Sequence, residues 1–378
     1  MIFDVIIIGG GIMGSSTAFQ LVKENKKCLL IDQFSLGHTY GSSHGDSRII
    51  RRAYPEGHFA KLMIDAYDLW HGLEKQYNEQ FIVTAGGLDF GPEYSPGMKN
   101  VVETVESLDL KHEILSSKEI SGKFPAFTLA DDIYGLYQSD AGIVLASKAL
   151  HFFQNTAKQN GLDVIMGEKV TGITEEQDHI SVSTPTNAFK AKKVVICAGS
   201  WINEFFTDFS LKFTTEVLPV NFGYWKVRNA DLFKVGNFPI FIYWSEKTFY
   251  GFPILERENY MKMGAHYSNN PIYFRNDDLS KHIQQDLVTD MDNFIEKTFP
   301  EALKNEHEID SCFYTMNENE NFILDFHPEN TNIVFGGGFS GHGFKFAPLI
   351  GKILSDLVIQ GETNFDIANF RFSNFKGN

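Results

Sequence analysis

The chain has 378 residues, enough for two domains, and its 43% apolar and 21% charged residues are ordinary for a soluble globular protein. It carries 33 Lys and Arg against 48 Asp and Glu, a formal net charge of −15, so its surface repels nucleic-acid phosphates and anionic membranes at long range. Three widely spaced cysteines, Cys28, Cys197 and Cys312, form neither a disulfide framework nor a metal-ligand pattern. We therefore expect a reducing compartment, no metal site, and neither nucleic acid nor membrane as a partner.

The N-terminal apolar run is short, contains Asp4 and lacks a basic flank. It is therefore not typical of a signal peptide or of a membrane span of ~20 apolar residues. No later segment is long enough to cross a bilayer, which favours a cytoplasmic location.

The first elements form a β-α-β pattern. Residues 3–8 are a β-branched run bounded by glycines, which is typical of a buried parallel strand. The residues after Gly14 predict a helix, and residues 28–31 predict a second buried strand that ends at Asp32.

Two kinds of sequence pattern alternate along the rest of the chain. Short aromatic and β-branched strands crowd residues 215–310, which favours an antiparallel sheet, whereas helices and buried strands alternate on either side. We expect an α/β + β fold, with a Rossmann-type FAD-binding domain and a discontinuous antiparallel-sheet substrate domain. The predicted FAD-binding domain comprises residues 1–84, 146–215 and 318–378, and the substrate domain residues 85–145 and 216–317. Helices are predicted at 59–73, 101–108, 150–157, 283–294 and 348–361, and strands at 81–90, 164–166, 180–183, 194–199, 240–244, 248–252, 260–264 and 333–335.

A G-x-G-x-x-G motif stands between the first strand and the first helix. Gly9 makes the tight turn, Gly11 lets the backbone approach a pyrophosphate, and Gly14 lets helix and strand pack closely. Asp32 follows Gly14 by 18 residues, where a ribose-binding carboxylate is expected. The motif alone does not separate FAD from NAD. The segment around Val170, followed by the returning strand at 194–199, resembles two-domain FAD oxidases more than an NAD dehydrogenase.

Three further segments carry a family resemblance. They are Gly41 to Tyr54, containing S-H-G-D-S-R-I-I-R; Tyr250 to His266, containing K-M-G-A-H; and Cys312 to Phe346, ending F-S-G-H-G-F-K-F. With them the chain resembles the monomeric sarcosine oxidase and N-methyltryptophan oxidase family over essentially its whole length. The resemblance implies a monomeric FAD enzyme that oxidises secondary amino acids, reduces O2 to hydrogen peroxide and releases formaldehyde from N-methyl substrates.

The resemblance also implies roles for four residues. Cys312 stands where the family attaches the flavin through a thioether. Arg51 and Lys345 match the pair that holds the substrate carboxylate, for which a guanidinium fork and an ammonium are well suited. Lys262 matches the lysine near flavin N5 that is implicated in oxygen activation, where a cation stabilises developing negative charge.

Other matched positions are expected to surround the flavin and the substrate. His266 is the expected hydrogen-bond partner of the substrate amine, because a histidine titrates near neutral pH. Gly341 and His342 open the last helix, whose N-terminus would stabilise an anionic reduced flavin. His44, Arg48 and Tyr250 match residues that line the cavity.

One departure and several alternatives remain open. Arg52 stands where the family has a histidine, and this extra cation is expected to alter the flavin environment. The substrate side-chain pocket, within residues 221–247, shows no residue that the resemblance assigns. An oxidase or dehydrogenase of a cyclic or glycated amino acid, a non-catalytic flavin-binding protein, and a plain NAD dehydrogenase are the rival interpretations.

Overall fold

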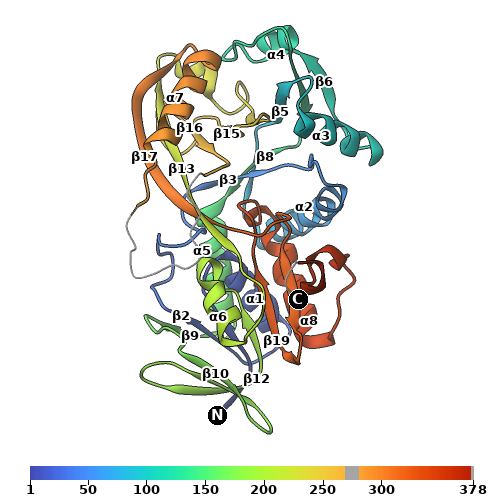
Figure 1. The fold of residues 1–378 in the computed structure, drawn as a ribbon, viewed down its shortest axis with the longest axis vertical. Coiled ribbons are helices and arrows are strands. Elements are labelled where there is room, and N and C mark those ends of the chain that lie inside the picture. Colours follow the sequence, from blue (N-terminus) through green and yellow to red (C-terminus); the bar gives the residue numbers. More distant parts are fainter. Residues whose placement is uncertain (269–280, 376–378) are drawn as a thin grey trace.

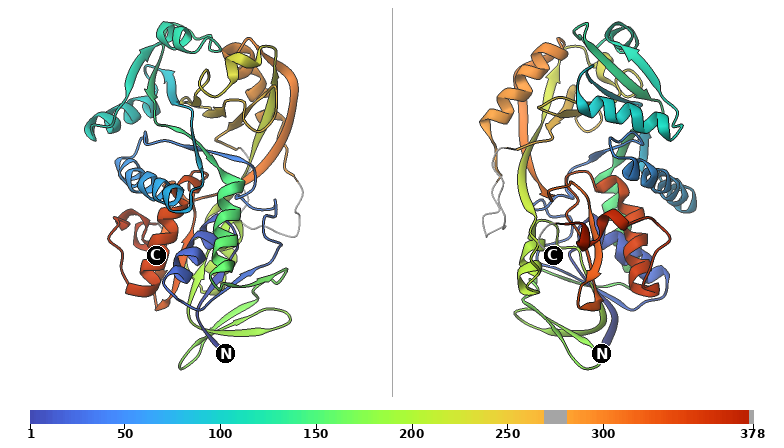
Figure 2. Two further views of the ribbon diagram at one scale, coloured as in Figure 1. Left: turned by 180° about the vertical axis from the view of Figure 1, so that it is seen from behind. Right: turned by 45° about the vertical axis from the view of Figure 1, so that its right-hand side comes forward.

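The computed structural model describes residues 1–268 and 281–375. Its described strands form three sheets. Figure 1 shows the first sheet at the end of the molecule near the N-terminus and the second sheet at the opposite end. The two further views agree with this arrangement (Figure 2). No helix in the described ranges is long and apolar enough to cross a membrane.

The first sheet has eight strands, in the order β10-β11-β12-β1-β2-β9, with β19 paired to β12 and β18 paired to β19. At its centre, β1 pairs in parallel with both β2 and β12, which confirms the predicted β-α-β unit. β1 from Val5 onward is buried and β2 is wholly buried, as expected for apolar strands at the centre of a parallel sheet. The strands are β1 (Ile2–Ile8), β2 (Cys28–Asp32), β9 (Asp163–Met166), β10 (Gly172–Glu175), β11 (Ile180–Ser183), β12 (Ala188–Ile196), β18 (Ile323–His327) and β19 (Asn330–Gly337).

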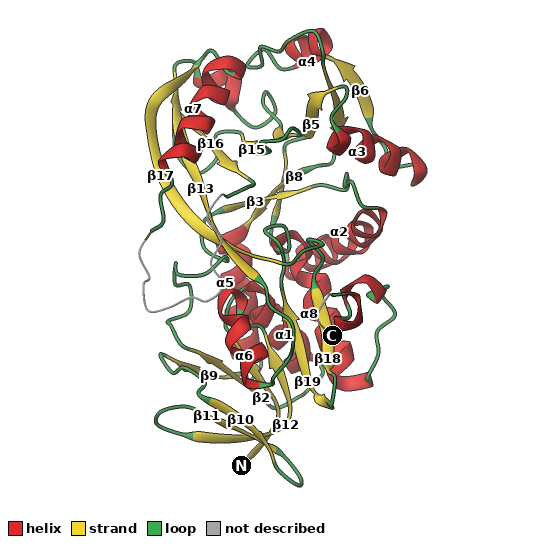
Figure 3. Ribbon diagram, viewed as in Figure 1, coloured by secondary structure: helices red, strands yellow, loops and turns green. Residues whose placement is uncertain are grey.

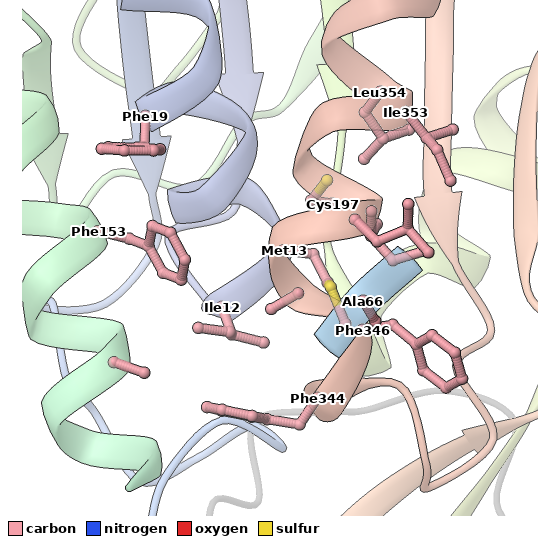
Figure 4. Close-up of a cluster of buried hydrophobic side chains, with 14 of the residues drawn as sticks. Ile12, Met13, Phe19, Ala66, Phe153, Cys197, Phe344, Phe346, Ile353 and Leu354 are labelled. Atoms are coloured by element: carbon pink, nitrogen blue, oxygen red, sulfur yellow. The ribbon is translucent and has the colours of Figure 1, made fainter. Parts of the chain in front are cut away.

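The main hydrophobic core lies among the helices beside this sheet. Helix α1 (Ile12–Lys23) contacts both α5 (Ala146–Gln159) and α8 (Ala347–Gln360), and these three helices lie together in Figure 3. Phe19 of α1 meets Phe153 of α5 edge-to-face, with ring centroids 5.3 Å apart (Figure 4). This packing fixes the N-terminus of α1, where the glycine turn lies. The other helices are α2 (Gly57–Tyr77), α3 (Pro96–Ser107), α4 (Ser117–Lys123), α6 (Ile202–Asp208) and α7 (Gln285–Thr298).

The second sheet also has eight strands, in the order β17-β13-β16-β15-β14-β5-β7-β6. It is not wholly antiparallel as expected, because β14 pairs in parallel with β5. This pair joins segments about 150 residues apart in sequence, which local patterns do not reveal. The strands are β5 (Gly87–Pro92), β6 (Glu113–Ser116), β7 (Ile133–Gln138), β13 (Glu216–Val227), β14 (Ile240–Tyr243), β15 (Phe249–Phe252), β16 (Tyr260–Ala265) and β17 (Ala302–Met316).

A small third sheet, in the order β3-β8-β4, joins β3 (Ser47–Ile50), β8 (Gly142–Leu145) and β4 (Ile82–Thr84). The run at 81–90, predicted as one strand, therefore supplies two strands to two different sheets. The break follows from Gly86, which has a positive φ of +73° and so turns the chain between β4 and β5.

Candidate active site

A cavity of about 460 Å³ runs from the glycine turn of the first sheet to residues of the second sheet. Its wall combines segments that are far apart in sequence. Of the predicted site residues it includes Gly9, Gly11, Asp32, Arg48, Arg51, Val170, Tyr250, Lys262, His266, Cys312, Gly341, His342 and Lys345.

The glycine turn has the geometry that its motif predicts. Gly9 adopts a positive φ of +103°, and a Cβ there would lie 2.3 Å from the carbonyl oxygen of Cys197. A Cβ at Gly14 would lie 1.9 Å from the carbonyl oxygen of Gly9, so only glycine lets α1 approach β1 this closely. The N–H group of Ile12, in the first turn of α1, donates to Ser43 Oγ at 3.0 Å.

Asp32 closes the turn from the end of β2. One carboxylate oxygen accepts the N–H of Gly10 at 2.6 Å, and the other accepts the N–H of Phe34 at 2.8 Å. Asp32 therefore fixes the backbone of the turn while lining the cavity. Val170, in the segment that precedes β10, lines the same end of the cavity wall.

Two buried cations, Arg51 and Lys345, lie at the other end of the cavity. Tyr54 connects them: the guanidinium of Arg51 lies 4.6 Å from its ring centroid, and Lys345 Nζ donates to its hydroxyl at 2.8 Å. The Nε and Nη1 groups of Arg51 are buried and have no hydrogen-bond acceptor among the described residues. Burial beside Arg51 holds the pKa of Lys345 well below its usual value. An anion entering here would satisfy unpaired donors and favour the charged lysine.

Trp244, immediately after β14, forms a wall over Arg51, with 5.6 Å between its ring centroid and the guanidinium carbon. Its indole N–H donates to the buried carboxylate of Asp89 on β5 at 2.8 Å. Two glycines make room for it: a Cβ at Gly91 would lie 2.4 Å from the Trp244 carbonyl oxygen, and a Cβ at Gly97 2.7 Å from its ring. Nothing in the local sequence around Trp244, apart from its place in an aromatic run, indicated a functional role.

Lys262 on β16 is buried and paired. Its Nζ lies 2.9 Å from a carboxylate oxygen of Glu256 and donates to Ser47 Oγ at 3.0 Å. Ser47 and Tyr224 both donate short hydrogen bonds to the same carboxylate. These donors and the lysine hold the pKa of Glu256 below its usual value. The family resemblance implied a lysine near the flavin but not its counter-ion, because no local pattern links residues 47, 224 and 256.

His266 follows β16 and packs beside Tyr314, with ring centroids 5.2 Å apart. Burial, together with Lys345 and Arg51, lowers its pKa to about 4. His266 therefore does not titrate near neutral pH, which corrects the expectation from the sequence; its imidazole is neutral there and can accept a hydrogen bond from an amine. Tyr250 on β15 completes this part of the wall, and burial raises its pKa.

Cys312 lies on β17, next to Phe313, whose carbonyl oxygen accepts a short hydrogen bond from Ser42. Burial raises the pKa of the Cys312 thiol to about 11, although Arg48 and Lys262 act in the opposite direction. Arg48, on β3, is held in place by the chain that precedes it, since it donates to the carbonyl oxygens of Ser42 at 3.0 Å and of Ser47 at 2.7 Å.

Gly341 and His342 lie in the loop before α8. Gly341 has a positive φ of +76°, and a Cβ there would lie 2.4 Å from the ring of Tyr314. The Nε2 of His342 donates to the carbonyl oxygen of Glu320 at 3.1 Å, which leaves Nδ1 to accept from the Tyr54 hydroxyl at 3.2 Å. Burial and Lys345 hold the pKa of His342 well below its usual value, so this loop presents a neutral ring.

Gly14 packs α1 against the glycine turn, as its motif predicts. Two other sequence expectations need correction. His44 is not part of the described cavity wall, and its Nδ1 lies 2.9 Å from the carbonyl oxygen of Gly41. Arg52 does not line the cavity either. It forms an ion pair with Asp140, and its guanidinium lies 3.8 Å from the ring centroid of Tyr67, so its charge is compensated away from the cavity.

Comparisons with known proteins agree with this arrangement. A family model described as FAD dependent oxidoreductase matches residues 4–357. Human peroxisomal sarcosine oxidase is 35% identical over 377 residues, which cover 99% of this chain and 96% of the relative. N-methyl-L-tryptophan oxidase of Escherichia coli is 28% identical, with both chains covered completely.

The fold also has solved counterparts. NikD, described as an unusual amino acid oxidase essential for nikkomycin biosynthesis, matches with a TM-score of 0.86 at 21% identity and covers 98% of this chain and 97% of its own. That likeness concerns the fold, whereas the sequence matches extend over the whole chain. The chain belongs to the FAD-dependent oxidoreductase family, among relatives named sarcosine oxidase and N-methyltryptophan oxidase, and is an enzyme that acts on CH–NH donors.

Proposed function

We propose that this enzyme oxidises small secondary amino acids, with sarcosine or another N-methyl amino acid as its substrate and O2 as its electron acceptor. The observation that carries the proposal is the buried pair Arg51 and Lys345 at one end of a cavity whose other end is the glycine turn. Among the described residues, the buried Nε of Arg51 has no hydrogen-bond acceptor and its Nη1 has only the carboxylate of Asp89 at 3.5 Å, so both can donate to a substrate carboxylate.

The residues at the glycine turn fit FAD. The absence of a Cβ at Gly9 allows the tight turn, and the N-terminus of α1 offers its positive dipole end to a pyrophosphate. Gly11, Asp32 and Val170 would complete the cofactor site at this end, and Gly341 and His342 would lie at the flavin. Bound FAD supplies the hydride acceptor and the place where oxygen is reduced.

The chain's own groups then hold and orient the substrate. Arg51 and Lys345 would bind the carboxylate, and the neutral ring of His266 would accept a hydrogen bond from the amine. Lys262 would offer positive charge to oxygen as it is reduced. For sarcosine, one O2 and one water would give glycine, formaldehyde and hydrogen peroxide.

Cys312 is the proposed attachment point of the flavin, since it is the cysteine of the described wall that lies beside Arg48 and Lys262. The domain boundaries given above, a monomeric state and a cytoplasmic location also stay proposals. The relative from human is named for the peroxisome, which describes that protein.

The first experiment is an anaerobic visible spectrum of the purified protein before and after adding sarcosine, N-methyltryptophan and proline in turn. We expect one of them to bleach the flavin band. Arg51→Met should lose this response at the same substrate concentration, whereas Arg52→Met should keep it, because Arg52 is paired outside the cavity. A yellow protein that none of the three bleaches would contradict the substrate assignment and favour another amine or a non-catalytic flavin-binding role.

A further inference from the structure

Asp89 is an unexpected neighbour for a carboxylate-binding arginine. It is 2% exposed, and its Oδ1 lies 3.5 Å from Arg51 Nη1. It is absent from the described cavity wall, so a substrate does not touch it. A negative charge placed behind Arg51 opposes the binding of any anion in front of it.

The surrounding structure fixes this carboxylate in place. Asp89 lies on β5, opposite Ile242 of the parallel neighbour β14. Two residues later in that strand's continuation, the backbone N–H of Trp244 donates to the carbonyl oxygen of Phe90 at 2.8 Å, and its indole donates to Asp89. Burial raises the pKa of Asp89, while Arg51, the indole donor and Lys345 favour its ionised form.

Asp89 changes the charge balance of the substrate end. Arg51 and Lys345 are two cations. Among the described residues, Asp89 has the carboxylate that lies within 4.0 Å of one of them, Arg51. With Asp89 ionised and both cations charged, the side chains of Arg51, Lys345 and Asp89 together carry one net positive charge. One substrate carboxylate would neutralise it, whereas a second carboxylate would leave an uncompensated negative charge in a poorly solvated place.

We propose that Asp89 makes the enzyme selective for amino acids that carry a single carboxylate and rejects those with a second one close to the first. Asp89 acts here as a specificity residue through Arg51, without contact with the substrate. The inference rests on the proposed role of Arg51 and Lys345 in carboxylate binding.

The test compares acetate and malonate, which differ by one carboxylate, as ligands of the oxidised holoenzyme at neutral pH and fixed ionic strength. Dissociation constants are taken from the change that each anion causes in the flavin absorption spectrum. Wild-type protein should bind acetate at least as tightly as malonate. Asp89→Asn keeps an acceptor for the Trp244 indole. This variant should increase the affinity for malonate at least tenfold more than it increases the affinity for acetate.

Trp244→Phe is the matched control, because it removes the indole donor and leaves the Asp89 charge. The affinities of this variant for acetate and for malonate should both fall. The ratio of the two dissociation constants should stay within twofold of the wild-type ratio. A ratio unchanged in Asp89→Asn, or changed equally in Trp244→Phe, would overturn the proposal. If Asp89→Asn does not fold, tighter binding of malonate than acetate to the wild type overturns it, and the reverse preference supports it. Because no turnover is needed, these outcomes are independent of whether sarcosine bleaches the flavin.

Discussion

The charge of Lys345 determines how the cavity binds a carboxylate as pH changes. Burial and Arg51 hold its pKa well below the usual value, and a bound anion favours the ammonium. Above the pKa of the free site, binding must therefore take up a proton, and acetate affinity should fall by up to about tenfold per pH unit. Below that pKa, this source of pH dependence should disappear. Acetate is suitable because it has no amine to titrate.

Lys345→Met should bind acetate more weakly at low pH and lose the pH dependence at high pH. The measurement is a series of acetate dissociation constants from flavin absorption across pH, for the wild type and this variant. If the acetate affinity of Lys345→Met still fell with rising pH, the titrating group would be a residue other than Lys345.

Cys312 gives a second prediction at the residue scale. With a pKa of about 11, its thiol is mostly protonated at neutral pH, and the thiolate is the nucleophile. When apoprotein is mixed with FAD, the rate of covalent attachment should rise about tenfold per pH unit below that pKa. The readout is the flavin that stays on the protein after denaturation. Cys312→Ser should retain none, whereas Cys197→Ala, which alters another cysteine of the cavity wall, should retain it.

At the scale of elements, the loop between β15 and β16 contributes stability through one buried ion pair. The side chains of Lys262 and Glu256 are 7% and 6% exposed. Glu256→Ala leaves the ammonium buried without its counter-ion, which should lower the free energy of unfolding by about 3–5 kcal/mol. Adding Lys262→Met should restore much of this loss, because the unpaired charge is gone.

Urea unfolding of the wild type, both single variants and the double variant measures the coupling between the two residues. The exposed pair Lys99 and Glu103 on α3 is a matched control, and Glu103→Ala should change stability by only about 0.5 kcal/mol or less. Additive effects of Glu256→Ala and Lys262→Met would contradict the predicted coupling.

The elements also show which parts of the fold sequence patterns can predict. The β-α-β unit and α2, α5, α7 and α8 follow from local apolar periodicity, so they were predictable. The parallel pairing of β5 with β14 was not, because it depends on packing between distant segments. Asp89 and Trp244 were missed as site residues for the same reason, since each contacts Arg51, which lies far from it in sequence. Glu256 is only six residues from Lys262, but it lies in the loop before β16, where no strand or helix periodicity predicts the pairing.

At the scale of the whole molecule, the cavity wall draws on both large sheets, so the cofactor would bind only the folded arrangement of the two. In Cys312→Ser, where FAD is held without a covalent bond, the free energy of unfolding should rise with free FAD, by about 2.7 kcal/mol at 100 times its Kd. Thermal unfolding at increasing FAD concentration measures this. Fully flavinylated wild type should unfold at a temperature independent of added FAD. A Tm of Cys312→Ser that does not respond to FAD would contradict the proposed cofactor site.

The two glycines behind Trp244 have a consequence for engineering a new substrate range. Gly91 and Gly97 leave no room for a Cβ against this tryptophan, although neither lines the cavity. A mutant library confined to the cavity wall would omit both positions. Alanine at either would press on Trp244 from behind and narrow the space over Arg51, so saturation of these two hidden positions is a direct way to search for variants that prefer smaller amines.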